Sequence, residues 1–167
     1  TDFGDWLRLE LRHDPAGRLI GFGPAEMGFL PGPDGAPLGD KSAADAEGLT
    51  EDADGGLLVS FEREARIWRY DGSDPPFASR PAAFPSPKAI VMLPANSGLE
   101  SIAVLEGGDI VTLAEGAEER GGDIAGWLGR GSSWAPIAWV RTPPYRPTDA
   151  ARLPDGARSF PSGGRRC

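Results

Sequence analysis

Short runs of alternating apolar and polar residues dominate the sequence, and this period of two predicts strands. In the first run, Leu7, Leu9 and Leu11 alternate with charged residues, which predicts a half-buried strand within residues 2–13. A partner strand is expected at 18–22, after a glycine-containing turn. Because no segment has a convincing helical period, the pattern predicts an all-β protein.

The later apolar runs are separated by segments rich in proline and glycine, which predict loops. The longest loops are expected at 23–41 and 71–88. Between and after these loops, hairpins are expected at 45–63 and 100–115, and further strands at 66–70, 89–93, 124–128 and 134–140.

The segment 45–63 reads DAEGLTEDADGGLLVSFER and predicts a hairpin with a two-residue turn at Asp54-Gly55. Glu47 and Glu62 are equidistant from this turn, so they are expected to be cross-strand neighbours, roughly 5 Å apart. Two like charges at that distance destabilise a hairpin unless a positive group lies between them. The acidic pair is therefore a candidate for a functional feature.

A second copy of this hairpin follows 53 residues later in the chain. Glu100 and Glu115 are again fifteen residues apart, and they flank Gly107-Gly108. A third copy is expected to begin near residue 146, with Asp149 in the position of Glu100. The recurrence indicates that the acidic hairpin is a repeated unit.

An all-β repeat of about 40 to 60 residues is typical of the four-stranded blades of a β-propeller. The sequence therefore predicts a partial β-propeller of about two complete four-stranded blades plus parts of two others. The chain would begin inside one blade and stop inside another, so the remaining propeller blades would be missing from it. In this repeat, Asp2 and Glu115 align with Glu62. A strand that contains a tryptophan follows each of the three acids, at Trp6, Trp68 and Trp127 respectively. These tryptophans are interpreted as packing between blades.

Composition excludes several classes of function. The net charge of −8 argues against a nucleic-acid partner, which needs a basic surface. No apolar run approaches the eighteen residues of a membrane span, and no signal peptide is visible in a chain that starts at Thr1. The only cysteine, Cys167, cannot form an internal disulfide.

Acids at the same end of successive blades are expected to converge near the propeller axis. Ca²⁺ takes six to eight oxygen ligands, whereas zinc prefers nitrogen and sulfur ligands that this chain hardly offers. In the alternative interpretation, the acids cap hairpins at a solvated rim or pair with arginines such as Arg63, Arg66 and Arg146. The candidate metal ligands are Asp45, Glu47, Glu62, Glu100, Glu115 and Asp149.

Three further residues are candidates for substrate binding. Arg63 offers a planar fork for a phosphate or carboxylate, or it is a structural partner of a neighbouring acid. Asn96 contributes an amide to the site, or it adopts a left-handed turn. Arg146 is the third candidate. The only histidine, His13, is interpreted as a surface residue, and without a G-x-S-x-G motif the sequence argues against Ser-His-Asp chemistry.

Several motifs, in order along the chain up to Gly156, are similar to bacterial phytase-like proteins, which are described as having esterase-like activity of the phytase family. The resemblance implies a β-propeller, a secreted or periplasmic location and distant kinship with calcium-dependent propeller phytases. Residues 1–156 would form this propeller fragment, whereas 157–167 depart from the family pattern and are expected to be an irregular, disordered tail. The motifs are DAEGL at 45–49, SFER at 60–63, IWRY at 67–70, NSGLE at 96–100, LAEG at 113–116 and RPTDAARLPDG at 146–156.

These observations lead to two hypotheses. In the first, the protein is a metal-assisted hydrolase of phosphate or carboxylic esters of small molecules, with Glu47, Glu100 and Arg63 as catalytic residues and water as the nucleophile. Because blades would be missing, a site built from the whole ring would be incomplete in this fragment. In the second, the protein is a non-catalytic propeller that binds a small ligand or a protein partner.

Overall fold

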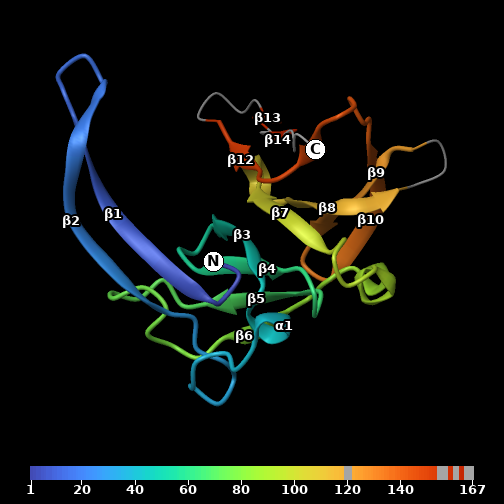
Figure 1. The fold of residues 1–167 in the computed structure, drawn as a ribbon, viewed down its shortest axis with the longest axis horizontal. Helices are drawn as coiled ribbons and strands as arrows, with labels where there is room; N and C mark the ends of the chain where they lie inside the picture. The colour runs from blue at the N-terminus through green and yellow to red at the C-terminus, as the bar shows by residue number, and fades with distance from the viewer. Residues whose placement is uncertain (119–121, 154–157, 160–161, 164–167) are drawn as a thin grey trace.

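The structure, a computed structural model, describes residues 1–118, 122–153, 158–159 and 162–163. It is all-β, as predicted, and two four-stranded antiparallel sheets form its centre (Figure 1). In each sheet the strands lie side by side in chain order. The first sheet contains β3 (Ala46–Glu51), β4 (Leu57–Phe61), β5 (Arg66–Tyr70) and β6 (Ala82–Phe84); the second contains β7 (Leu99–Val104), β8 (Ile110–Glu118), β9 (Ile124–Arg130) and β10 (Ser133–Trp139).

Smaller elements surround these sheets. A long hairpin precedes them, and two short strand pairs follow them. The expected boundary at 156 and most of the tail lie outside the described residues, but the described part of the tail forms strands. These elements are β1 (Asp5–His13) paired with β2 (Leu19–Phe29), β11 (Arg146–Pro147) with β14 (Ser162–Gly163), β12 (Ala151–Arg152) with β13 (Arg158–Ser159), helix α1 (Lys41–Ala44) and the 3-10 helices η1 (Lys88–Met92) and η2 (Glu106–Gly108).

The hairpin β3–β4 and the hairpin β7–β8 have the same loop, displaced by 53 residues. In the first, Asp52 N donates to Gly56 O at 2.7 Å and Gly55 adopts a φ of +80°. In the second, Leu105 N donates to Asp109 O at 2.6 Å around an equivalent glycine. Three residues therefore lie between the paired positions, and the predicted two-residue turn is wrong. The glycine in each loop was the signal for this turn, because it supplies the left-handed position of a three-residue loop.

The longer loop changes how the acids are placed. Glu47 is the extra residue of a β-bulge, because the pairing with β4 skips it between Ala46 and Gly48. The pairing of β7 with β8 skips Glu100 in the same way. The expectation that Glu47 is the cross-strand partner of Glu62 is therefore wrong. A bulged residue leaves the regular alternation, so the fold re-aims the acid at the same point of both sheets.

The first sheet obtains its fourth strand from a segment that was expected to be loop. Residues 82–84 form β6, whereas the strand predicted at 89–93 is largely the 3-10 helix η1. In this helix Ile90 N donates to Pro87 O at 3.1 Å, and the Ile90 side chain is only 2% exposed. A single turn thus buries Ile90 while its apolar neighbours Val91 and Met92 stay exposed.

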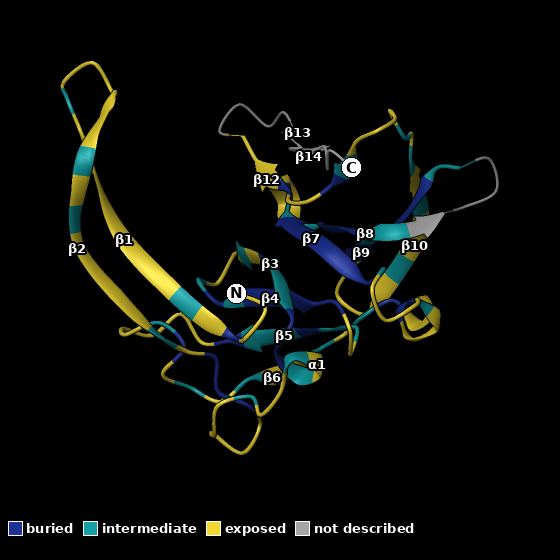
Figure 2. Cartoon of the chain, viewed as in Figure 1, coloured by how far each residue is buried: buried dark blue, intermediate teal, exposed yellow. Residues whose placement is uncertain are grey.

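The hairpin β1–β2 projects away from the two sheets, and most of its residues are exposed (Figures 1 and 2). Leu7, Leu9 and Leu11 have exposed fractions of 62%, 40% and 52%. The prediction of a half-buried strand is therefore correct for the strand and wrong for its burial, because alternation shows which residues share a face and not what covers it. Strand β2 also runs to Phe29, so it occupies part of the loop expected at 23–41.

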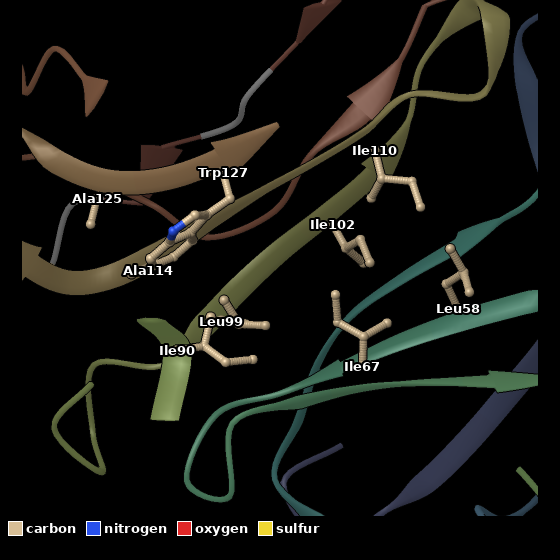
Figure 3. Close-up of a cluster of buried hydrophobic side chains, with 9 residues drawn as sticks. All are labelled: Leu58, Ile67, Ile90, Leu99, Ile102, Ile110, Ala114, Ala125 and Trp127. Atoms are coloured by element: carbon tan, nitrogen blue, oxygen red, sulfur yellow. The ribbon is translucent and has the colours of Figure 1, made fainter. Parts of the chain in front are cut away.

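The main core fills the space between the two sheets. Leu58 and Ile67 of the first sheet point toward Ile102 of the second (Figure 3). All three are at most 1% exposed. Burial of such a side chain stabilises the folded state by about 1.5–3 kcal/mol. Among the described residues, no helix is long and apolar enough to cross a membrane.

Ile102→Ala should lower the free energy of unfolding by about 2–5 kcal/mol, because it leaves a cavity between the sheets. The matched substitution Leu11→Ala, at a site that is 52% exposed, should change it by no more than about 0.5 kcal/mol. Urea denaturation followed by circular dichroism measures both. Equal effects of the two substitutions would show that the sheets do not pack through Ile102.

Candidate functional site

Two groups of three carboxylates lie at the open ends of the hairpins β3–β4 and β7–β8. Within each group, one carboxylate oxygen from every residue lies within 4.8 Å of the others. Five of the six metal ligands predicted from the sequence belong to these groups, together with Asp2. The first group is Asp2, Asp45 and Glu47, and the second is Glu62, Glu100 and Glu115.

Close approach of the two sheets assembles the second group. Gly98 lies directly before β7, and a Cβ there would be only 2.1 Å from the backbone oxygen of Glu62. Gly98 O also accepts a hydrogen bond from Glu115 N at 3.1 Å. Only glycine permits this approach, which brings the end of β4 next to Glu100 and Glu115.

Asp45 is the most buried member of the first group, with 1% of its surface exposed. It follows helix α1 directly, and its Oδ2 accepts a hydrogen bond from Arg63 Nε at 2.8 Å. Its Oδ1 accepts no hydrogen bond, and Lys41 Nζ lies 3.7 Å away. Buried polar atoms are nearly always satisfied, so this oxygen marks a position where a cation or a proton would be stabilised.

Burial, together with the crowding of carboxylates, raises the pKa of two of them. Burial, and then the negative charges of Asp45, Asp2 and Glu62, raise the pKa of Glu47 to about 7. Burial also raises the pKa of Glu62, with further contributions from the charge of Asp45, a hydrogen bond to Asp45 and the charge of Glu115. These influences of Asp45 on Glu62 show that the two groups adjoin there.

Arg63 and Arg146 both make structural contacts at the site. Arg63 is the ion-pair partner of Asp45, which is the structural role weighed for it in the sequence. Arg146 Nη1 donates to the backbone oxygen of Glu115 at 3.1 Å. Both guanidinium groups therefore hold the acidic segments in place, and a contact of either one with substrate stays a prediction.

The structure does not bring Asn96 or Asp149 into either carboxylate group. Asn96 is exposed in a turn closed by a hydrogen bond of 2.9 Å from Ser97 N to Pro94 O. Asp149 is exposed as well, and its Oδ1 accepts from Ala150 N at 2.7 Å. Their roles as substrate contact and metal ligand stay predictions.

Sequence reasoning left Asp2 and Lys41 out of the candidate site. Asp2 had a signal, because it aligns with Glu62 and Glu115 in the repeat. Lys41 had none, because it lies in a segment that was expected to be loop. Its Nζ lies 2.7 Å from Asp2 Oδ2, and this contact is the main cause of the lowered pKa of Asp2.

A cleft opens beside the first group, between β1 and the first sheet. It encloses about 690 Å³, and Glu47 is part of its wall. A carboxylate whose pKa lies near 7 therefore faces a space large enough for a small molecule.

A family model described as "Phytase-like: Esterase-like activity of phytase" matches residues 1–161 of the chain. No curated protein and no solved structure matches the chain.

In metal-free buffer, Glu47 should make the stability of the native chain depend on pH. Its folded-state pKa of about 7 lies above the ordinary value of 4.5, so its contribution to stability is complete below pH 4.5 and is lost as the pH rises through 7. Glu47→Gln removes this loss. The melting temperature of the native chain, relative to the variant, should fall between pH 5 and 8 by about 2–4 °C for each kcal/mol.

Thermal unfolding in the presence of a chelator measures this difference. Glu106→Gln is the control, because Glu106 is exposed in the loop at the other end of the second hairpin. It should follow the native chain at every pH. Parallel curves for the native chain and Glu47→Gln would show that the pKa of Glu47 is not raised.

Gly98→Ala should lower the free energy of unfolding by about 1–3 kcal/mol, because the added methyl group would overlap the backbone oxygen of Glu62. Gly39→Ala is the matched control, since a Cβ at Gly39 would have no heavy atom within 4 Å. Urea denaturation of both variants tests the close approach of the sheets. Equal stability of the two variants would contradict it.

Proposed function

Because the chain belongs to the phytase-like family, we propose that it is a metal-assisted hydrolase of phosphate or carboxylic esters. The observation that carries this proposal is the buried carboxylate of Asp45. It is surrounded by acids, and one of its oxygens accepts no hydrogen bond. A bound cation would neutralise the group and complete the coordination of that oxygen.

Calcium is the proposed ion, with ligands drawn from the two carboxylate groups. All six side chains offer hard oxygen ligands, and the spacing within each group suits the loose geometry of calcium sites. Such an ion would polarise a substrate oxygen and lower the pKa of a bound water. Lys41 and Arg63 hold the acids in place beside it.

We assign the proton transfer to Glu47. Its side chain lines the cleft, and its pKa of about 7 in the metal-free chain would be lowered by an adjacent cation, so that the ionised carboxylate could accept a proton from the attacking water. In this proposal Glu100 occupies the equivalent bulge of the second sheet and serves as a ligand. Arg63 is a positioning residue that orients Asp45.

The proposed setting for this site is a β-propeller whose consecutive blades are the two four-stranded sheets. The shared loop, the shared bulge and the offset of 53 residues support this assignment. A periplasmic or secreted location is proposed from the resemblance alone.

Isothermal titration with Ca²⁺ tests the metal site on the chelator-treated chain. The native chain and Glu106→Gln should bind Ca²⁺ and unfold at a higher temperature in its presence. Ca²⁺ at a hundred times the dissociation constant should stabilise them by about 2.7 kcal/mol. Glu47→Gln and Glu100→Gln should each weaken binding by at least about tenfold, because each removes a negative charge from the site.

Affinity should also rise with pH through 7, since Glu47 must lose its proton to bind a cation. Aryl acetates and aryl phosphates then test for hydrolysis. Absence of Ca²⁺ binding at pH 8 would overturn the metal site. Binding without hydrolysis of either ester class would instead favour the non-catalytic, ligand-binding propeller.

A further inference from the structure

The cleft beside Glu47 has an apolar wall that the proposed chemistry does not explain. Its volume of about 690 Å³ is within the range of small-molecule binding sites, roughly 300–1,000 Å³. Side chains from β1, from the loop after β2, from β4 and from the loop after β5 form this wall. Its apolar members include Trp6, Leu7, Leu30, Leu57, Val59 and Phe77, and Leu49 of β3 lines the cleft as well.

An unusual backbone conformation places one of these side chains. Phe77 has a φ of +59°, in the left-handed region that bulky residues avoid. Its ring packs edge-on against Tyr70, with centroids 5.0 Å apart, and its centroid lies 5.7 Å from that of Trp6. Such a conformation is unfavourable, and residues of this kind cluster at active sites and ligand sites.

The charged residues of the cleft disfavour an anionic occupant. Among the described residues that line it, Arg8 is the only basic side chain, whereas Asp5, Glu47 and Glu51 are acidic. Arg8 Nη2 is already paired with Glu26 at 2.7 Å and with Asp74 at 2.9 Å. A polyphosphate would therefore enter a space where acidic side chains outnumber basic ones, and where the described lining residues offer no basic side chain free of an acidic partner.

We propose that this cleft binds the apolar part of an uncharged ester, and that the ester group points toward Glu47. The substrate class is then an aryl or branched-alkyl ester of a small carboxylic acid, and not an inositol polyphosphate. This inference rests on the proposed function, because the carboxylate groups supply the chemistry. It adds the site that selects the substrate.

The test uses a non-reactive probe, 2-naphthyl methyl ether, followed by saturation-transfer NMR on the full chain. Leu49→Trp fills the cleft from β3, at a position that is 54% exposed. Leu11→Trp is the matched control, because Leu11 is 52% exposed and lies outside the cleft. The probe should bind equally to the native chain and to Leu11→Trp, and at least tenfold more weakly to Leu49→Trp.

Leu7→Trp fills the cleft from the opposite wall and should weaken binding by a similar factor, so the test does not depend on the folding of one variant. Inositol hexakisphosphate should not displace the probe. Equal binding by Leu11→Trp and by both cleft-filling variants would overturn the assignment, as would displacement by inositol hexakisphosphate.

Hydrolysis of 2-naphthyl acetate separates this inference from the proposed function. The proposed function predicts turnover by the native chain, and the cleft assignment adds a KM at least tenfold higher in Leu49→Trp than in Leu11→Trp. Turnover with the same KM in both variants would overturn the cleft assignment and leave the hydrolase standing. Probe binding as described without any turnover would overturn the hydrolase and leave the apolar site standing.

Discussion

The two four-stranded sheets approach each other closely at two glycines, and the carboxylate site depends on this contact. A Cβ at Gly98 would overlap the backbone of Glu62, and a Cβ at Gly48 would lie only 3.0 Å from Ile102 N. Larger residues would hold the sheets apart. The glycines therefore let the acid-bearing ends of the two sheets adjoin, while Ile102 and its neighbours fill the core behind them.

Such a gathering of like charges costs free energy, and the protein offsets the cost in two ways. Lys41 and Arg63 pair with the acids around Asp45. Where no basic side chain pairs with an acid, a raised pKa allows the carboxyl group to keep its proton, as at Glu47. One buried oxygen of Asp45 nevertheless accepts no hydrogen bond. A residual cost of this kind is typical of a site that is stabilised by a ligand.

The sequence predicted the elements that repeat and failed where packing or turn chemistry decides. The offset of 53 residues between Glu47 and Glu100 identified the repeated hairpin, and five of the six expected ligands do gather. The bulges were missed because a one-residue difference in loop length moves every pairing. The fourth strand was misplaced because Ala82–Phe84 is short, whereas the more apolar segment around Ile90 is held in a helical turn. Exposure of Leu7 and its neighbours depends on distant contacts that no local pattern contains.

The group formed by Glu62, Glu100 and Glu115 has a mechanical consequence, because its members belong to different sheets. Glu62 directly follows β4 of the first sheet, whereas the other two lie in strands of the second. When all three are ionised, their repulsion acts across the interface and favours separation of the sheets. Neutralisation by protons or by a cation removes this repulsion, and the same three residues then hold the two sheets together. The strength of the joint between the sheets is therefore set by the solution around it as well as by the core inside it.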